Sequence, residues 1–197
     1  MDVAGVALIS VAAVLTAICG YQSGRWSGAQ TRDYNVANAH RVESAEAADR
    51  GFALTAIDVN LFLHYVDAVS EGNTRDADFI HRRFRPEMRP AMKAWLATKP
   101  LTNPHAPSSP FVMPQYTLAT NLASHKLAAQ ASRDFDAAQL ANRHADDFLL
   151  LTVIFASVSF LAGMSTKLIY PRHAIVIALG LVGLVYGLIR LVELPFM

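Results

Sequence analysis

Three long apolar runs set the pattern of this chain: they occupy residues 3–20, 148–166 and 174–192. The first two carry no charged residue, and the third carries only Arg190, which lies near an end and can extend its charge toward water. A helix of about 20 mostly apolar residues crosses the ~30 Å hydrocarbon core of a membrane. Only Asp2, and no basic residue, precedes the first run, so we expect a retained span there and not a cleaved signal peptide. The pattern predicts three transmembrane helices.

The intervening residues 21–147 contain the charged, helix-prone part of the chain and are predicted to be an extramembrane insert. Neither residues 21–70 nor residues 115–164 contain proline, so two long helices are expected to continue out of the first two spans. Each carries a stripe of small or apolar residues at helical spacing. The stripes are Ala45, Ala48, Phe52, Thr55, Val59, Phe62, Val66 and Val69, and Leu118, Leu122, Ala128, Ala131, Phe135, Ala138 and Ala145. We expect the two helices to pack antiparallel as a stalk.

Residues 72–114 differ in composition and are predicted to form the tip of the insert. The first long helix should end at residues 71–73, where glycine and asparagine favour a stop and Thr74 can cap the next helix. Short helices are expected at residues 74–84 and 87–97, followed by an irregular loop with five prolines and a helix start at Pro114. The predicted fold is therefore all-α: three transmembrane helices with a long antiparallel helical-hairpin stalk.

A basic cluster in the tip is the strongest candidate for a binding site. It comprises His81, Arg82, Arg83, Arg85, Arg89 and Lys93, with Lys99 shortly after. Such a cluster can bind phosphate, a lipid headgroup or an acidic partner. Alternatively, it pairs with the acids just upstream, Glu71, Asp76 and Asp78. The net charge of +1 and the lack of a recognisable motif argue against nucleic acid as a partner.

Two sets of residues suit structural work in the membrane. Gly180, Gly183 and Gly187 in the third span give the small-residue spacing that lets membrane helices approach closely, either between copies of the chain or against its own first two spans. Tyr21 and Trp26 follow the first span, where aromatic side chains anchor helices at the membrane–water interface. Trp26 also suits packing against the partner helix of the stalk.

The residue patterns of catalysis and ion conduction are missing. The seven histidines are scattered without metal-ligand spacing, and no phosphate loop, dinucleotide fingerprint or nucleophile motif is present. We expect no enzyme activity, catalytic residue, cofactor or metal. In the spans, Arg190 and Glu193 are spaced to pair with each other. The hydroxyls of Thr152, Ser157 and Ser159 could line a pore, but such groups usually bond to their own backbone.

The charges flanking the spans decide weakly between the two orientations. The loop at residues 165–173 carries Lys167 and Arg172 without an acid, but the membrane-proximal ends of the insert are also basic. The start of the chain, with Asp2 and no basic residue, favours an outside N-terminus and a cytoplasmic insert.

Four sequence segments carry a resemblance to a class of small bacterial inner-membrane proteins. They are residues 20–28 (GYQSGRWSG), 84–87 (FRPE), 94–97 (AWLA) and 109–114 (SPFVMP). The layout of an N-terminal span, a helical insert and a C-terminal two-span hairpin resembles that class over nearly the whole chain. The resemblance implies topology and a plasma (inner) membrane location, and it implies no activity.

These observations favour a non-enzymatic structural or accessory membrane protein that acts through protein contacts. It would work as a homo-oligomer or as a subunit of a larger complex, with membrane lipid around its spans. One alternative is a homo-oligomeric channel or transporter. A second is a binder of lipid headgroups or anions through the basic cluster.

Overall fold

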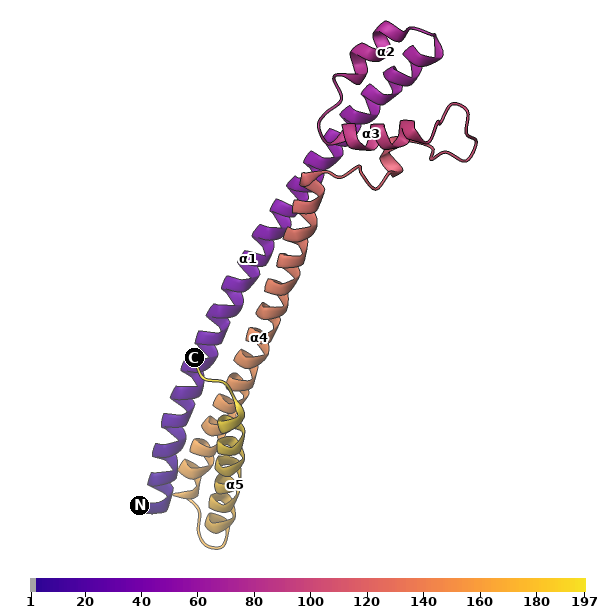
Figure 1. Cartoon of the computed structure of the whole chain (residues 1–197). Helices are drawn as coiled ribbons and strands as arrows, with labels where there is room; N and C mark the ends of the chain where they lie inside the picture. The colour runs from indigo at the N-terminus through magenta and orange to yellow at the C-terminus, as the bar shows by residue number, and fades with distance from the viewer. Residues whose placement is uncertain (1–2) are drawn as a thin grey trace. The chain divides into compact units, whose positions relative to one another are not determined.

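The computed structural model describes residues 3–197, and helices account for nearly all of them (Figure 1). The elements are α1 (Val3–Ser70), α2 (Thr74–His81), α3 (Met88–Ala97), the short 3-10 helix η1 (Pro110–Val112), α4 (Ala119–Ser165) and α5 (Arg172–Glu193). No strand occurs among these residues. The predicted all-α class is confirmed.

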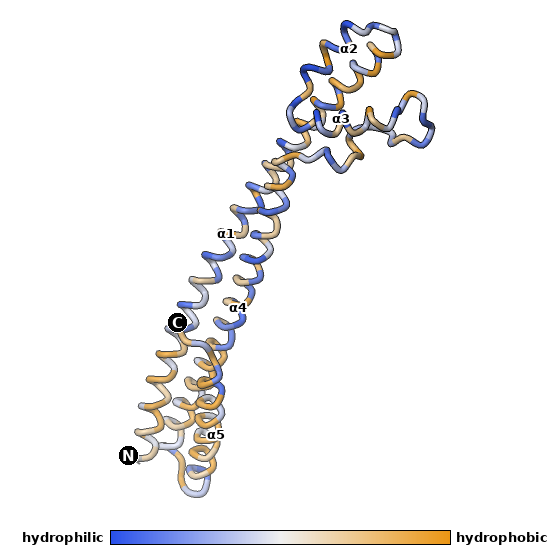
Figure 2. The backbone as a smooth tube through the Cα atoms, viewed as in Figure 1, coloured by the Kyte–Doolittle hydropathy of each residue, from blue (hydrophilic) through white to orange (hydrophobic). Residues whose placement is uncertain are grey.

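Three of these helices, α1, α4 and α5, are long and apolar enough to cross a membrane. Figure 2 shows their apolar segments: the first turns of α1, the last turns of α4 and most of α5. This arrangement agrees with a multi-pass membrane protein. The chain divides into two compact units. The membrane unit comprises residues up to 37 together with 132–197, and the insert unit comprises residues 38–131.

All three apolar helices contribute to the core of the membrane unit. One buried cluster joins Cys19 of α1, Phe148, Leu151 and Phe155 of α4, and Leu191 of α5. A second cluster joins Leu8, Ala12, Val158 and Ala162. Large apolar side chains on the outside of the unit, such as Val14, Leu150 and Val182, are more than half exposed in the protein alone. A lipid-facing surface has this composition, because hydrocarbon solvates such side chains as well as a protein core does.

Contacts within the membrane unit pair early residues of α1 with late residues of α4. The Ser23 hydroxyl donates to the carbonyl of Ala145 at 2.9 Å. Further along α1, the rings of Tyr34 and Phe135 lie 5.5 Å apart. These contacts join α1 and α4 within this unit.

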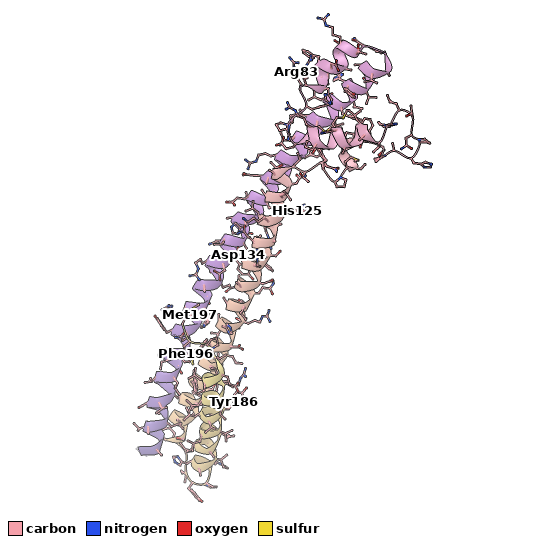
Figure 3. All side chains as sticks on the ribbon, in the orientation of Figure 1. Arg83, His125, Asp134, Tyr186, Phe196 and Met197 are labelled. Carbon is pink, nitrogen blue, oxygen red and sulfur yellow. The ribbon has the colours of Figure 1, made fainter. Side chains whose placement is uncertain are left out.

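Residues 194–197 turn back from the end of α5 onto α1 and α4 (Figure 3). The side-chain amide of the buried Gln22 donates to the carbonyl of Met197 at 3.0 Å and accepts from its N–H at 2.9 Å. The Trp26 indole N–H donates to the carbonyl of Pro195 at 3.1 Å, and the ring of Phe196 meets Phe148 edge-on at 5.5 Å. These contacts satisfy polar groups that would otherwise lie unpaired beside apolar surface.

The core of the insert unit is aromatic and methionine-rich. Phe62 of α1 packs with Phe84 and with Met88, Met92 and Trp95 of α3. The ring of Phe62 meets the rings of Trp95 and Phe111 nearly edge-on, an arrangement that aromatic quadrupoles favour. The Trp95 indole N–H donates to the carbonyl of Pro107 at 2.8 Å, which ties the proline-rich loop to α3.

The predicted end of α1 is confirmed, with one change in the next cap. Gly72 adopts φ +73°, which suits glycine because other residues pay a steric cost there. The cap of α2 is Asn73, whose side chain accepts from the N–H of Asp76 at 3.2 Å, whereas Thr74 is the first helical residue. The expectation for Thr74 was therefore wrong by one position.

Two other expectations for the insert are corrected. The helix expected from Pro114 begins at Ala119, because residues 114–118 are a turn and an irregular segment in which Tyr116 contacts Asp58 of α1. On α1 the predicted stripe is buried at Phe62 but not at Ala45, Ala48 or Phe52. Ala47, Gly51 and Asp58 are buried instead, so the packed face is turned around the helix from the predicted one.

Candidate functional site

A buried carboxylate lies at the centre of the insert unit. Asp58 of α1 is fully buried, and its Oδ2 accepts a hydrogen bond from the Tyr116 hydroxyl at 3.0 Å. The same hydroxyl lies 3.4 Å from the Thr55 Oγ1 one turn earlier. The Nε of Arg85 lies 3.7 Å from the Asp58 Oδ1, and its Nη2 lies 3.1 Å from a carboxylate oxygen of Glu87. This Asp58 node joins α1, the turn after α2 and the turn before α4.

Burial dominates the electrostatics of the node. Loss of solvation raises the pKa of Asp58, and the hydrogen bond from Tyr116 and the charge of Arg85 oppose that rise only in part. Burial also raises the pKa of Tyr116. By contrast, hydrogen bonds from its own backbone and from Arg85 lower the pKa of Glu87. Asp58 Oδ1 and Arg85 Nη1 are buried without a hydrogen-bond partner in the protein, so the pair is close but incompletely satisfied.

The members of the predicted basic cluster have different surroundings. Arg85 turns inward to Asp58 and Glu87. The Arg83 guanidinium lies 3.4 Å from the centre of the Phe79 ring and donates to the Phe79 carbonyl (Figure 3). Arg89 donates to the carbonyls of Phe84 at 2.9 Å and Arg82 at 3.3 Å. The acids that the cluster meets are thus Asp58 and Glu87.

None of the six basic side chains forms an ion pair with the upstream acids Glu71, Asp76 or Asp78 in the described part of the chain. The Asp76 carboxylate instead accepts from the Asn73 side chain at 2.7 Å. The pairing suggested by the sequence is therefore not the one that forms. The physical reason is that Arg85, at the turn between α2 and α3, reaches a buried partner on α1.

Four members of the cluster line one hollow of the surface. His81, Arg82, Arg89 and Lys93, with Leu96, surround a space of about 660 Å³. Arg89, Lys93 and Leu96 recur along one face of α3, and His81 and Arg82 come from the end of α2. We call this the basic hollow. Arg83 and Arg85 are not part of its lining among the residues described.

An apolar cavity of about 640 Å³ lies on the other side of Leu96. Its lining comes from α1 (Phe62, Leu63, Tyr65, Val66, Val69 and Ser70), from α3 (Trp95 and Leu96) and from the following loop, including Lys99 and Leu101. Lys99 adopts φ +54°, a left-handed conformation that is unusual for a residue with a side chain. Volume and lining are those of a small-molecule site.

The three glycines of α5 face the chain's own helices. A Cβ at Gly180 would lie 3.2 Å from Leu8 of α1. One at Gly183 would lie 3.0 Å from Val158, and one at Gly187 only 2.5 Å from the Phe155 ring. Close approach within one molecule accounts for these small residues, and packing between copies of the chain stays a prediction. The glycines are what allow α5 to approach α1 and α4 closely.

The two aromatic residues after the first apolar run have different environments. Tyr21 is exposed, and its hydroxyl accepts from Arg25 at 3.1 Å. Trp26 is half-buried, and the centre of its ring lies 4.6 Å from that of His144 of α4, with the two rings tilted by 50°. Tyr21 thus has the exposure of an interfacial anchor, whereas Trp26 packs within the membrane unit and holds the tail through Pro195.

The polar groups of the spans are internally satisfied, as expected. The hydroxyls of Thr152, Ser157 and Ser159 donate to backbone carbonyls four residues earlier at 2.8–3.1 Å. Arg190 pairs with Glu193 at 2.7 Å. Among residues 3–197, no group of three His, Cys, Asp or Glu side chains is arranged to hold a metal ion.

Sequence reasoning missed the Asp58 node. Asp58 lies in a stretch of mostly apolar residues, 52–63, and a lone acid there was not singled out. The one available signal was its spacing from Ala47, Gly51 and Phe62, which places the four residues on one face of the helix. Comparisons with known proteins give no further guide: no family model, no curated protein and no solved structure matches the chain.

Proposed function

We propose that this chain is a non-enzymatic membrane protein that acts through protein contacts, as a homo-oligomer or as a subunit of a larger complex. One observation carries the proposal: an apolar stripe on α1, within the insert unit, whose two largest side chains are more than half exposed. The stripe consists of Phe52, Ala56, Val59 and Leu63. Phe52 is 78% exposed and Leu63 is 54% exposed.

The spacing of the stripe supports a helical partner. Its members recur at intervals of four, three and four residues, which is the a/d spacing of a coiled-coil seam. A phenylalanine exposed to this degree costs free energy in water, and burying it in a partner would recover about 1.5–3 kcal/mol. Contiguous exposed apolar residues on a folded protein mark interaction sites. The stripe is also distinct from the packed face that carries Gly51, Asp58 and Phe62.

We further propose that α1 and α4 form an antiparallel hairpin stalk. The contacts inside each unit support it: Ser23 with Ala145 in the membrane unit, and Ser44 with Ser124 in the insert unit at 3.0 Å. The proposed location is the plasma (inner) membrane of a bacterium, with the insert on the cytoplasmic side. Leu101 is 77% exposed. Thiol labelling of the L101C variant in sealed vesicles of known orientation tests on which side of the membrane the insert lies.

Site-specific photocrosslinking tests the contact face. A photoreactive phenylalanine analogue at Phe52 should give one discrete adduct in native membranes, with a second copy of the chain or with another subunit. The matched control is Ala53, which is also exposed but is turned about 100° around the helix. Equal or diffuse crosslinking from the two positions would contradict a contact face at Phe52.

A further inference from the structure

The apolar cavity and the basic hollow are neighbours along α3. Leu96 lines both of them. A second contact joins them, because the ring of His81 in the basic hollow lies 6.0 Å from the ring of Tyr65 in the apolar cavity. An apolar space and a cationic space therefore share a border inside the insert unit.

We propose that this pair of spaces binds one anionic amphiphile, with its apolar chain in the cavity and its carboxylate or phosphate head group on the basic hollow. This inference rests on different observations from the proposed contact face, although Leu63 belongs to the stripe and also lines the cavity. The site consists of the four basic side chains of the hollow, the shared Leu96, and the aromatic side chains that line the cavity.

The apolar cavity fits the chain of such a ligand. Its 640 Å³ lies within the ~300–1,000 Å³ typical of small-molecule sites, and Phe62, Val66 and Trp95 are among its walls. Trp95 is held in place by its hydrogen bond to the Pro107 carbonyl, so this wall of the cavity is formed before a ligand binds. Each methylene group that enters should strengthen binding about fourfold.

The basic hollow fits the head group. His81, Arg82, Arg89 and Lys93 line it, and no carboxylate is found among its described lining residues. Arg89 is fixed by its two bonds to backbone carbonyls, which leaves less side-chain freedom to be lost on binding. Arg82 and Lys93 are exposed and form no ion pair with an acid in the described chain. Charge-assisted bonds to phosphate or carboxylate are the strong ones for such groups.

One acid lies near the border. Burial raises the pKa of the Tyr65 phenol, and the charge of Asp78 on α2 raises it further. That charge would repel an anionic head group placed beside Tyr65. The head group should therefore lie toward Arg89 and Lys93, and D78N should tighten binding.

Quenching of Trp95 fluorescence tests the proposal directly. The full-length chain carries W26F, so that Trp95 is its only tryptophan, and is held in an amphipathic polymer free of lipid. The probes are a lysophosphatidate with a bromine-labelled acyl chain, the bromine-labelled fatty acid, the neutral monoacylglycerol with the same chain, and inorganic phosphate. Bromine quenches tryptophan only at close range, so saturable quenching reports a chain in the cavity.

We expect saturable quenching by an anionic probe at about tenfold lower concentration than by the neutral one. The stronger of the two anionic probes identifies the head group. R82Q and K93Q should each weaken anionic binding about tenfold and leave the neutral probe unchanged. L96E should block both, and R75Q, at an exposed basic residue outside the hollow, should change nothing.

Three results would overturn the proposal. One is equal binding of neutral and anionic probes with no effect of R82Q and K93Q. Another is no quenching up to the solubility limit while inorganic phosphate alone protects the hollow from arginine modification. The third is a loss of affinity in K99M alone, which would place the head group inside the cavity instead.

Discussion

The Tyr116 hydroxyl donates a 3.0 Å hydrogen bond to the carboxylate of Asp58, and this contact joins the turn before α4 to the middle of α1. The ring of Tyr116 also meets Phe111 nearly edge-on at 5.1 Å. A single side chain thus links the buried charge of the insert unit to its aromatic core. The walls of the apolar cavity rest on the same core through Phe62 and Trp95.

Removing that hydroxyl should weaken the insert unit. In Y116F the ring contacts persist while Asp58 loses its hydrogen bond, so the free energy of unfolding should fall by about 1–3 kcal/mol. Urea unfolding followed by Trp95 fluorescence in the W26F background measures it. Y170F, at a tyrosine that is 82% exposed, is the control and should unfold like the parent.

Asp58 should give the insert unit an unusual dependence on pH. Because its pKa is raised above 3.8 in the folded chain, the folded state takes up a proton before the unfolded state does as the pH falls. The contribution of Asp58 to the free energy of unfolding should therefore increase as the pH falls through the raised pKa, and level off near the unfolded value.

D58N provides the comparison because it cannot titrate. Unfolding of parent and D58N from pH ~8 to pH ~4.5 should show the parent gaining stability relative to the variant as the pH falls. The Glu87 carboxyl changes stability with pH in the opposite direction, because its pKa is lowered in the folded chain. That effect sets in below pH 4.5, the ordinary pKa of the group, and it is the same in both proteins. A parent that loses stability relative to D58N over this range would contradict a raised pKa.

The glycines of α5 should control stability within one molecule. In G187A the new methyl group would meet the Phe155 ring, and in G183A it would meet Val158 at 3.0 Å. We expect G187A to lower the free energy of unfolding by about 1–3 kcal/mol in detergent micelles, through overpacking. G183A should have a smaller effect.

Gly20 supplies the matched control for those variants, since a Cβ there meets nothing within 4 Å. G20A should be neutral or slightly stabilising, because alanine favours a helix by about 1 kcal/mol over glycine. If G187A instead changed the mass of the particle without changing its stability, the glycines would be an intermolecular contact.

The tail should be released by loss of Gln22. Q22A removes both hydrogen bonds to Met197, so amide hydrogen exchange in residues 194–197 should become faster by about tenfold. Exchange measured by mass spectrometry on the purified protein checks this, with Q30A, about two turns further along α1, as control. Unchanged exchange in Q22A would show that Trp26 and Phe148 hold the tail alone.

The sequence predicts the parts of this molecule that local physics decides. Apolar runs of about the length that crosses a bilayer core give the three candidate spans, and Gly72 ends α1 because its φ is positive. The irregular loop follows from its prolines. Backbone bonding by Thr152, Ser157 and Ser159 follows from the behaviour of hydroxyls in apolar helices.

The sequence alone does not predict contacts between distant segments of the chain. Asp58 is buried only because Tyr116 and Arg85 come to it from other segments, and no spacing along α1 records that. The burial of Asp58 selects the packed face of the helix, which is why Phe52 is exposed although it lay in the predicted stripe. The sequence alone identifies the basic cluster. The separation of Arg85, which turns inward to Asp58, from the open basic hollow depends on how α2 and α3 fold onto α1.

The mass of the intact particle is the most direct test of the central claim, that this membrane protein acts through protein contacts. The particle should be extracted from native membranes into nanodiscs without detergent exchange and weighed at its natural abundance. The account predicts a defined particle heavier than one 21.5 kDa chain with its lipid, either a multiple of the chain or a complex with stoichiometric partners. The introduction of F52E should dissociate it. A particle that contains one chain only, with or without F52E, would contradict the account.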